Sequence, residues 1–442
     1  MTKKRVLVYL ASDFHARSFF SGEVPSLIEE SFDLTLVITE EIKVSEITAK
    51  FDLRRVESRP SAGKLFGIYL DASLVRNLSK SSSFRFRLIR FLLGDYPKKL
   101  GFSPRGVIRL AKAGFFALPG VYSHLCKRYR NSVMEQSDLA KIVNEKKIDL
   151  IICWCSSMEP VALETVVISK RDGAKSLLVY DNWDNLTSKA VMLDKPDYLV
   201  CFGEQSKSFA KSIHQIPAGS VYALGSARFD VYKGRIKRDP KVKRAVLVAG
   251  SSIALEDREI LRVISREINS SPAESIFKQS EFYYRPHPAP QGLSVDLENW
   301  EFPEIALEGE ALSKSKNKTY WQDQLSLATT LSSKKVVIAA PTTLLLEALL
   351  SGCYVIVPAL PVKSVRTSIR KMLLELEHLK GLANLPNLVI AYDERTLIEE
   401  TQKTLSAPNI DKENINLGMF LTTNPGTFAS RFLDLLSDLM KD

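Results

Sequence analysis

The sequence predicts an α/β protein of two doubly wound domains with parallel sheets, which face each other across a cleft. Short apolar runs alternate with amphipathic stretches along almost all of the 442 residues, as they do in successive βαβ units. Hydrophobic residues make up 45% of the chain and charged residues 25%, which are globular values and supply two cores. A polar, turn-rich stretch at residues 227–243 separates the two series and is the expected linker.

The strands of the first domain are predicted by continuous runs of Val, Ile and Leu, because strands of a parallel sheet are buried on both faces. These runs are residues 5–10, 34–38, 150–154, 176–180 and 198–202. Amphipathic helices are expected at 137–147 and 204–213. Lys3, Lys4 and Arg5 precede an apolar run of only six residues, which is too short for an export signal and fits a first strand.

The second domain repeats this pattern. Its strands are expected at residues 245–249, 282–285, 335–339 and 354–358. The apolar window 336–362 contains Pro341, Glu347, Gly352 and Pro358, so we expect a strand, a helix and a strand rather than a membrane span. We therefore expect a first domain at 1–230, a second at 243–426, and a terminal helix at 427–442 that crosses back to the first domain.

The positive charge of the chain is concentrated in one segment. Residues 76–130 hold thirteen Lys and Arg residues against one acid, Asp95, while the whole chain has a net charge of +10. Arginines alternate with Phe and Leu at 84–93, and an apolar run follows at 114–118. We interpret the segment as a basic, mainly helical insertion that contacts an anionic membrane surface or an anionic acceptor. A solvated helical subdomain is the alternative, and no pattern typical of nucleic-acid binding accompanies the charge.

Cysteine usage and motif content restrict the compartment and the chemistry. The five cysteines include no C-x-x-C pair, which favours a reducing compartment over a disulfide scaffold or a zinc ribbon. No His/Cys/Asp/Glu array predicts a metal site, and no cofactor is expected. We expect a cytoplasmic protein, peripheral at the inner face of the membrane.

Ligands of open α/β sheets bind beyond the carboxyl ends of the strands, and two polar clusters follow strands of the first domain. After the first strand, Asp13 is a candidate general base and His15 and Arg17 are candidate substrate contacts. A helix cap followed by solvated side chains is the alternative. The second cluster is too polar for a simple turn, although an Asx-turn with a helix cap would also account for it. Its members are Asp181, Asn182, Trp183, Asp184, Asn185 and Lys189, with Trp183 suited to stack on a sugar or base.

Three further clusters follow strands of the second domain. Arg285-Pro286-His287-Pro288 fixes the direction of an imidazole beside a guanidinium, which suits a phosphate oxygen. Thr342 and Thr343 offer hydroxyls at the start of a helix, where backbone N–H groups also favour anions. Gly250, Ser251 and Ser252 form a weaker candidate phosphate loop.

Two motifs of the second domain carry a resemblance to a known family: Arg-Pro-His-Pro at 285–288 and Pro-Thr-Thr-Leu-Leu-Leu-Glu-Ala-Leu at 341–349. With these motifs, the chain resembles the GT-B glycosyltransferases, which have two Rossmann-like domains. The likeness is to bacterial surface-carbohydrate enzymes that use cytidine-linked donors, including Kdo and sialic acid transferases and CDP-glycerol polymerases. Residues 183–189 and 225–230 look like surface-polysaccharide biosynthesis proteins of the same group, as in capsule and lipopolysaccharide assembly.

The resemblance implies a metal-independent transfer of a sugar from a CMP- or CDP-linked donor to a lipid-linked or growing glycan. It implies that His287-Pro288 and Thr342-Thr343 hold the donor phosphate with Arg285, and that Glu347 reaches the ribose. His287 could also protonate the leaving phosphate. Asp13, or else Glu159 after the strand at 150–154, would deprotonate the acceptor hydroxyl. The alternatives are a CDP-polyol phosphotransferase, a UDP-sugar 2-epimerase-like enzyme, and a non-enzymatic peripheral membrane scaffold.

Overall fold

The computed structural model divides the chain into two compact units. It describes residues 3–39, 42, 51–56, 60–93, 104–135, 137–156, 159–233, 244–251, 256–287, 295–308, 324–361, 368–411 and 415–441. Unit 1 comprises residues 1–92, 102–230 and 418–442, and unit 2 comprises residues 93–101 and 231–417. Pro288 and Ser252, two of the predicted site residues, lie outside the described part of the chain.

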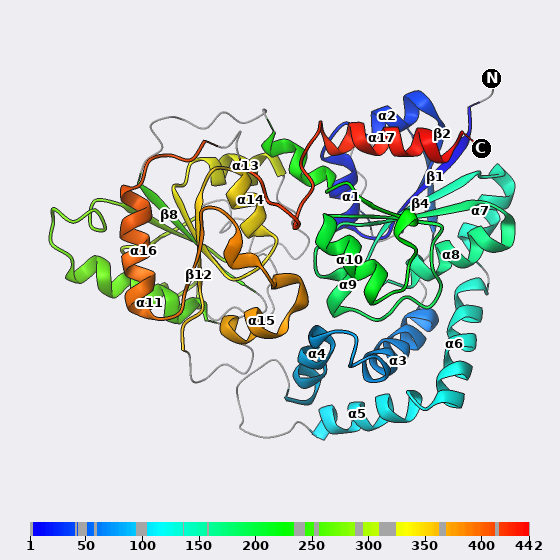
Figure 1. Cartoon of the computed structure of the whole chain (residues 1–442), viewed down its shortest axis with the longest axis horizontal. Coiled ribbons are helices and arrows are strands. Elements are labelled where there is room, and N and C mark those ends of the chain that lie inside the picture. The colour runs from blue at the N-terminus through cyan, green and yellow to red at the C-terminus, as the bar shows by residue number, and fades with distance from the viewer. Residues whose placement is uncertain are drawn as a thin grey trace. The chain divides into compact units, whose positions relative to one another are not determined.

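Unit 1 is built on a parallel sheet in the order β3-β2-β1-β4-β5-β6-β7 (Figure 1). The strands are β1 (Arg5–Leu10), β2 (Asp33–Thr39), β3 (Asp52–Val56), β4 (Leu150–Cys155), β5 (Lys175–Tyr180), β6 (Tyr198–Cys201) and β7 (Val221–Ala223). All five strands predicted for this domain are present. The structure adds β3 and β7, which are the two edges of the sheet.

Helices cover both faces of this sheet, because successive side chains of each strand point to opposite sides. On one side, Val6, Val8 and Leu10 join a core with α1 (Asp13–Phe20), α2 (Val24–Ser31) and α17 (Phe428–Leu439). On the other side, Leu7 and Tyr9 join a core with α7 (Asp138–Lys146), α8 (Pro160–Asp172) and α10 (Glu204–Ser212). The short helix α9 (Asn185–Ser188) follows β5.

The last helix, α17, is part of unit 1 although it follows unit 2 in the sequence. Phe432 packs edge-on against Trp154 of β4, with 5.2 Å between ring centroids. Asp230 accepts hydrogen bonds from the N–H groups of Phe428 and Ala429 at 2.8 and 3.2 Å. This residue ends the segment 102–230 of unit 1, and its carboxylate binds free N–H groups in the first turn of α17. The returning chain also passes so close to Gly225, which has a φ of +88°, that a Cβ there would collide with the carbonyl of Thr422.

Between β3 and β4, the described residues form four helices, which constitute the insertion in the first domain. The basic segment 76–130 contributes α4 (Ser82–Leu93), α5 (Pro104–Phe116) and most of α6 (Pro119–Met134), and α3 (Pro60–Arg76) precedes it. Phe66, Tyr69, Leu125 and Tyr129 form a small core of their own, which also includes Leu163 of α8. The insertion is therefore a helical layer attached to unit 1.

Two of the aromatic residues that alternate with arginines in α4 do not face solvent. Phe84 and Phe86 are buried, and the Arg87 guanidinium donates a hydrogen bond of 2.7 Å to the carbonyl of Ser188. Phe84 and Phe86 are two residues apart, so in a helix they lie on different sides. Both of these sides are covered by other parts of the protein. Among the described residues of the insertion, the most exposed large apolar side chains lie on α5 and just beyond its end.

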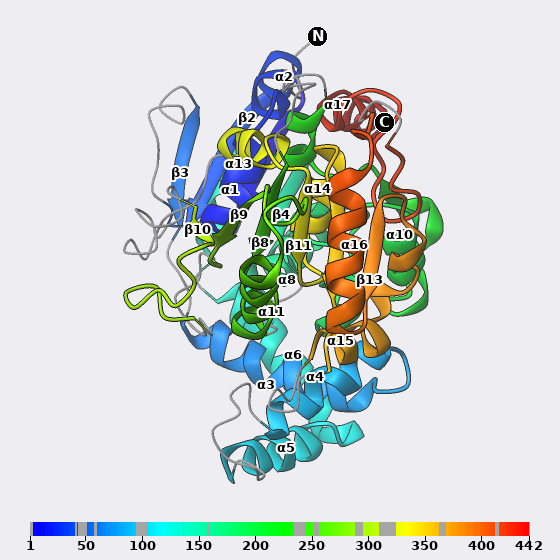
Figure 2. The same cartoon turned by 90° about the vertical axis from the view of Figure 1, so that its left-hand side faces the viewer.

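Unit 2 has a second parallel sheet in the order β10-β9-β8-β11-β12-β13. Its strands are β8 (Ala245–Ala249), β9 (Glu281–Arg285), β10 (Ala306–Leu307), β11 (Val336–Ala339), β12 (Tyr354–Pro358) and β13 (Leu388–Ala391). Figure 2 shows α11 (Asp257–Ser270) and α16 (Glu394–Ser406) together on one face of this sheet. Figure 1 shows α13 (Gln324–Ser332) and α14 (Leu344–Leu350) on the other face, and α15 (Ile369–Glu375) follows β12.

The apolar window 336–362 contains β11, α14 and β12, which confirms the predicted strand, helix and strand. Across the described ranges, no helix has both the length and the apolar character needed to cross a bilayer. All five cysteines are buried free thiols.

Candidate functional site

The order of the strands locates one candidate site in each unit. In a doubly wound sheet, ligands bind at the carboxyl ends of the strands where the strand order reverses. In unit 1 this switch point lies between β1 and β4, and in unit 2 it lies between β8 and β11. The residues that follow these four strands include Asp13, His15 and Glu159 in unit 1 and Gly250, Thr342 and Thr343 in unit 2.

An imidazole and a carboxylate meet at the switch point of unit 1. His15 lies in the first turn of α1, and Glu159 is the residue that precedes α8. His15 Nδ1 lies 3.7 Å from Glu159 Oε1 and within hydrogen-bonding distance, 2.8 Å, of the Ser12 hydroxyl. The N–H of Ser156 donates to Glu159 Oε2 at 2.8 Å and fixes the direction of the carboxylate. The structure therefore brings together two residues that the sequence analysis proposed from separate strand ends.

Burial displaces the pKa values of both groups. It lowers the pKa of His15 to about 4, so this imidazole is neutral at physiological pH. It raises the pKa of Glu159 to about 7, although the hydrogen bond from Ser156 and the charge of Lys189 oppose the rise. A carboxyl group with a pKa close to neutrality can accept or release a proton, which is the property of a general base or acid. The Glu159 side chain is still 27% exposed and can reach a ligand.

The other residues after β1 occupy different positions. Asp13 is the first residue of α1 and is partly exposed. The Arg17 guanidinium lies over the ring of Phe14, 5.8 Å from its centroid. Of the two candidate bases, Glu159 is the one that the structure places beside an imidazole.

Much of the polar cluster after β5 is turned into unit 1, contrary to the prediction of an open acceptor surface. Asp181 is buried and accepts a hydrogen bond from the hydroxyl of Ser226, and burial raises its pKa despite the nearby guanidinium of Arg228. Trp183 is 5% exposed, with its ring 5.9 Å from that of Phe420, so it is a packing residue and not an open stacking platform. Asn185 is likewise buried in the short helix α9.

Three residues of this cluster keep partial exposure. They are Asn182, Asp184 and Lys189. Asp184 precedes α9, accepts a hydrogen bond of 2.9 Å from the Ser188 hydroxyl and pairs with Lys189 at 3.2 Å. The Asp184 carboxylate makes no capping hydrogen bond to the N–H groups of α9, so it is held by Ser188 and Lys189 instead. Lys189 also contributes positive charge near Glu159.

In unit 2, Gly250 marks a tight crossing at the end of β8. A Cβ on this residue would lie 2.7 Å from Asp257 Oδ2, 2.8 Å from the Tyr284 hydroxyl and 3.0 Å from the backbone nitrogen of His287. The N–H of Gly250 donates to the carbonyl of Arg285, and that of Ser251 donates to Asp257. These two N–H groups are already used within unit 2, so they do not form the phosphate cradle that the sequence suggested.

His287 and the two threonines follow strands on either side of β8. His287 comes after β9, and Thr342 and Thr343 come after β11. Because neighbouring strands lie about 5 Å apart, the two strand ends are about 10 Å apart, a span that a diphosphate and its sugar can bridge. Both threonines are partly exposed, and within the described part of the chain neither hydroxyl is bound by another residue. Burial lowers the pKa of His287, so the ring is neutral and can donate one N–H.

Two other predicted donor contacts are altered by their surroundings. Arg285 forms an ion pair with Glu308, with 2.7 Å between Nη1 and Oε2, and both side chains are largely buried. This pairing neutralises the guanidinium that the sequence analysis assigned to phosphate. Glu347 lies on α14 and is 4% exposed. The helix has only seven residues, so the threonine hydroxyls are a better-supported phosphate contact than the helix terminus.

A pair of buried carboxyl groups near Gly250 was not predicted from the sequence. Glu256 precedes α11 and Asp257 begins it, and burial raises the pKa of each to about 7. Asp257 accepts a hydrogen bond of 2.9 Å from the Tyr284 hydroxyl, and Glu256 accepts one of 3.3 Å from the N–H of Ile369. Adjacent acids at a helix start are typical of ordinary helices, so only their burial, which the sequence does not reveal, distinguishes them.

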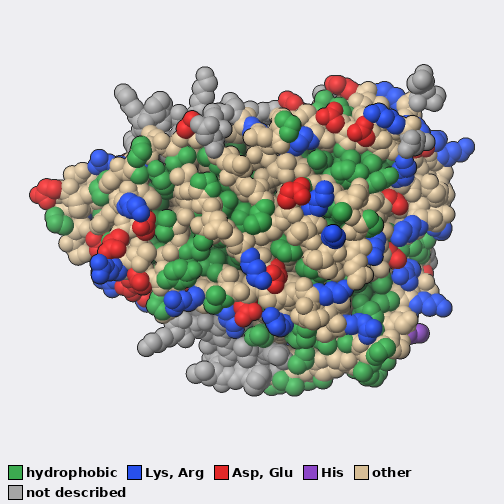
Figure 3. Space-filling view, viewed as in Figure 1, with side chains coloured by type: hydrophobic (Ala, Val, Ile, Leu, Met, Phe, Trp, Pro, Cys, Tyr) green, Lys and Arg blue, Asp and Glu red, His purple; other side chains and the backbone are tan. Residues whose placement is uncertain are grey.

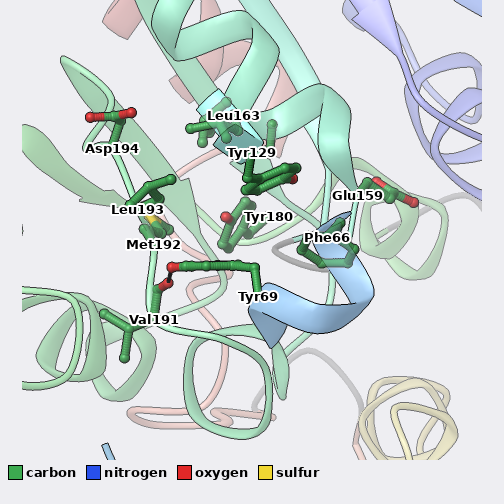
Figure 4. A pocket seen from close by; sticks show the side chains of 12 residues that line it. Phe66, Tyr69, Tyr129, Glu159, Leu163, Tyr180, Val191, Met192, Leu193 and Asp194 are labelled. Carbon is green, nitrogen blue, oxygen red and sulfur yellow. Dashed lines mark hydrogen bonds between the residues drawn. The ribbon is translucent and has the colours of Figure 1, made fainter. Parts of the chain in front are cut away.

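A cavity of about 30 Å³ lies between the insertion and the sheet of unit 1 (Figure 4). Glu159 and Asp194 lie on opposite sides of it, and the tyrosine rings of residues 69, 129 and 180 are between them. This volume holds one or two water molecules but not a sugar. The cavity is therefore too small to be the substrate site, although it lies beside Glu159.

Comparison with known proteins shows the fold of the chain. No protein-family model and no curated protein sequence matches it. Its structure resembles UDP-GlcNAc 2-epimerase from Methanocaldococcus jannaschii, with a TM-score of 0.55 and 10% identity over 98% of this chain and 99% of that one. A putative UDP-N-acetylglucosamine 2-epimerase from Listeria monocytogenes gives a TM-score of 0.53 and 11% identity over 100% and 97% of the two chains. UDP-N-acetylglucosamine 2-epimerase from Rickettsia bellii gives a TM-score of 0.53 and 11% identity over 99% of this chain and 96% of that one. Two parallel α/β domains with these neighbours constitute the GT-B fold, as the sequence predicted.

Proposed function

We propose that this protein transfers a sugar from a nucleotide-activated donor to a hydroxyl group of an acceptor. The observation that carries the proposal is the pairing of Glu159 with His15 at the switch point of unit 1, where the pKa of Glu159 lies near neutrality. The fold supports a nucleotide-sugar substrate, since this chain matches enzymes named for UDP-GlcNAc along nearly their whole length.

In the proposed reaction, the Glu159 carboxylate takes the proton of the acceptor hydroxyl. The acceptor oxygen then bonds to the anomeric carbon, the bond from that carbon to the phosphate oxygen breaks, and its electron pair remains on the phosphate. The phosphate would accept hydrogen bonds as its charge develops. The donors would be the hydroxyls of Thr342 and Thr343 and one N–H of His287. The neutral His15 ring and Ser12 would keep the carboxylate in position.

A UDP-sugar 2-epimerase-like enzyme is the second candidate, and the likeness to UDP-GlcNAc 2-epimerases favours it. The helical insertion favours the transferase, because an epimerase needs no macromolecular or lipid-linked acceptor. The cytidine-linked donor, the surface-glycan acceptor and the alternative transfer of a polyol phosphate remain predictions from sequence.

Nucleotide binding is the first test. Thermal unfolding is measured with CMP, CDP and UDP, because a ligand that binds the folded state raises the melting temperature. A response to CMP or CDP supports the cytidine-linked donor, whereas a response to UDP alone favours an epimerase or a UDP-sugar transferase. No response to any of the three would contradict both enzyme proposals and favour a scaffold.

Substitution of the two candidate bases tests the assignment of Glu159. With the nucleotide sugar that binds, Glu159→Gln should lower turnover by about 10² to 10⁴-fold, since the amide cannot accept the proton. Asp13→Asn is the matched control and should retain most activity. If Asp13→Asn lost turnover and Glu159→Gln retained it, Asp13 would be the general base. Near-normal turnover by His287→Ala would remove that residue from the mechanism.

A further inference from the structure

Helix α5 of the insertion presents an apolar face to solvent. Val107, Ile108, Phe115 and Leu118, the last just beyond the helix, are between 47% and 57% exposed. Ile108 and Phe115 are seven residues apart and Val107 precedes Ile108, so at 3.6 residues per turn these three positions lie within about 100° of one another around the helix. Gly106 and Ala113 are buried on the other side, toward the rest of the insertion. Figure 3 shows hydrophobic side chains gathered at the lower edge of the molecule, where Figure 1 places α5.

The charges that share this face are all positive. Arg105 and Lys112 are exposed on α5, and no Asp or Glu occurs anywhere from residue 104 to residue 134. Other cations of the insertion have structural partners, because Arg109 forms a two-pronged pair with Asp71 and Arg130 does the same with Asp194. The exposed cations are therefore separate from those that hold the insertion together.

We propose that α5 docks on the surface of an anionic lipid bilayer. Its axis would lie parallel to the membrane, with Ile108 and Phe115 in the acyl boundary and Arg105 and Lys112 at the level of the headgroups. An amphipathic helix with apolar side chains on one face and cations beside them is suited to this environment. The positive charge favours a bilayer over a second copy of the chain, because two copies of this face would repel each other. This proposal requires no substrate and stands independently of the proposed function.

Flotation with lipid vesicles tests the proposal in the full chain. The protein should float with vesicles of phosphatidylcholine mixed with phosphatidylglycerol and should stay unbound with phosphatidylcholine alone. High salt should weaken the binding, because screening shortens the range of the attraction to lipid charge. A wild-type protein that fails to float with the mixed vesicles would overturn the proposal.

Two double variants separate the apolar and the ionic contributions. Ile108→Ser with Phe115→Ser should abolish flotation, while Leu325→Ser with Leu374→Ser, two exposed leucines of unit 2, should leave it unchanged. Arg105→Ala with Lys112→Ala should weaken binding to the mixed vesicles by about 25-fold, at about fivefold for each cation. Lys195→Ala with Lys211→Ala, two exposed cations elsewhere in unit 1, is its control.

The same variants distinguish lipid binding from self-association. All four should retain the wild-type melting temperature, because the altered side chains are exposed. Light scattering should give one molar mass for wild type and the Ile108/Phe115 variant. A wild-type dimer that this variant converts to a monomer would overturn the proposal and make the α5 face a contact between copies. Equal flotation of each variant and its control would also overturn it.

Discussion

Asp257 is a buried carboxyl group whose ionisation opposes folding. Its pKa in the folded chain is about 7, because burial disfavours the charged form, whereas the ordinary value is 3.8. Between these two values the folded state holds a proton that the unfolded state has released. The contribution of this group to stability is therefore present at low pH and is lost as the pH rises toward 7.

Asp257→Asn should remove this pH dependence. The amide oxygen can still accept hydrogen bonds from Tyr284 and Ser251 but cannot ionise. The free energy of unfolding of the variant, relative to wild type, should increase by up to about 3 kcal/mol between about pH 5 and about pH 8. Urea unfolding at several pH values measures this difference. A difference that does not change with pH would show that Asp257 is already ionised in the folded chain.

Gly250 is the residue whose replacement should disturb the unit 2 site most directly. An alanine Cβ would lie 2.7 Å from Asp257 Oδ2 and 3.0 Å from the backbone nitrogen of His287, so one of these groups must move. Gly250→Ala should therefore destabilise the protein by about 1–3 kcal/mol and weaken nucleotide binding. Gly120→Ala is the control, because no atom lies within 4 Å of a Cβ there. Equal melting temperatures for the two variants would contradict the tight crossing.

Sequence alone identified several residues at the two switch points but not how they pair. Strand ends can be located from apolar runs, and this sufficed to propose His15, Glu159, His287 and Thr342. Burial and partners depend on contacts between segments that are distant in the chain. Arg285 was expected to be open to phosphate, yet it pairs with Glu308.

The strands that were predicted and those that were missed differ in position within the sheets. All nine predicted strands are interior, whereas β3, β7, β10 and β13 are the edges of the two sheets. An interior strand is buried on both faces and between neighbours, so its sequence is a continuous apolar run. An edge strand has a neighbour on one side only, and three of the four edges here are short or polar. β3 is Asp-Leu-Arg-Arg-Val and β10 has two residues. The fourth, β13, is Leu-Val-Ile-Ala, as long and as apolar as the interior strand β11, so its omission has no such explanation. A continuous apolar run predicts that a segment is buried, and it predicts a strand only where burial and strand pairing coincide.

Helix α17 should be essential to the core of unit 1. Phe432 is 1% exposed and packs against Trp154 and Phe428, so its removal leaves a cavity beneath the sheet. Phe432→Ala should lower the free energy of unfolding by about 3–5 kcal/mol. Ser437→Ala, an exposed position on the same helix, should have little effect. Denaturant unfolding measures both, and similar stabilities would show that α17 does not contribute to this core.

At the scale of the whole molecule, the two units have separate sheets and separate buried residues. Calorimetric unfolding should therefore depart from a single two-state transition. The proposed phosphate contacts all belong to unit 2, so a bound nucleotide should mainly stabilise the transition of that unit. The gain should be about 2.7 kcal/mol when the free nucleotide is at about a hundred times its Kd.

The two stability variants assign the transitions. Gly250→Ala should lower the transition that responds to nucleotide, and Phe432→Ala should lower the other, because the two substitutions lie in different units. If both variants and the nucleotide shifted one common transition, the units would unfold as one cooperative body. If the nucleotide shifted only the transition lowered by Phe432→Ala, the phosphate site would belong to unit 1, and the assignment of Thr342, Thr343 and His287 as donor contacts would be wrong.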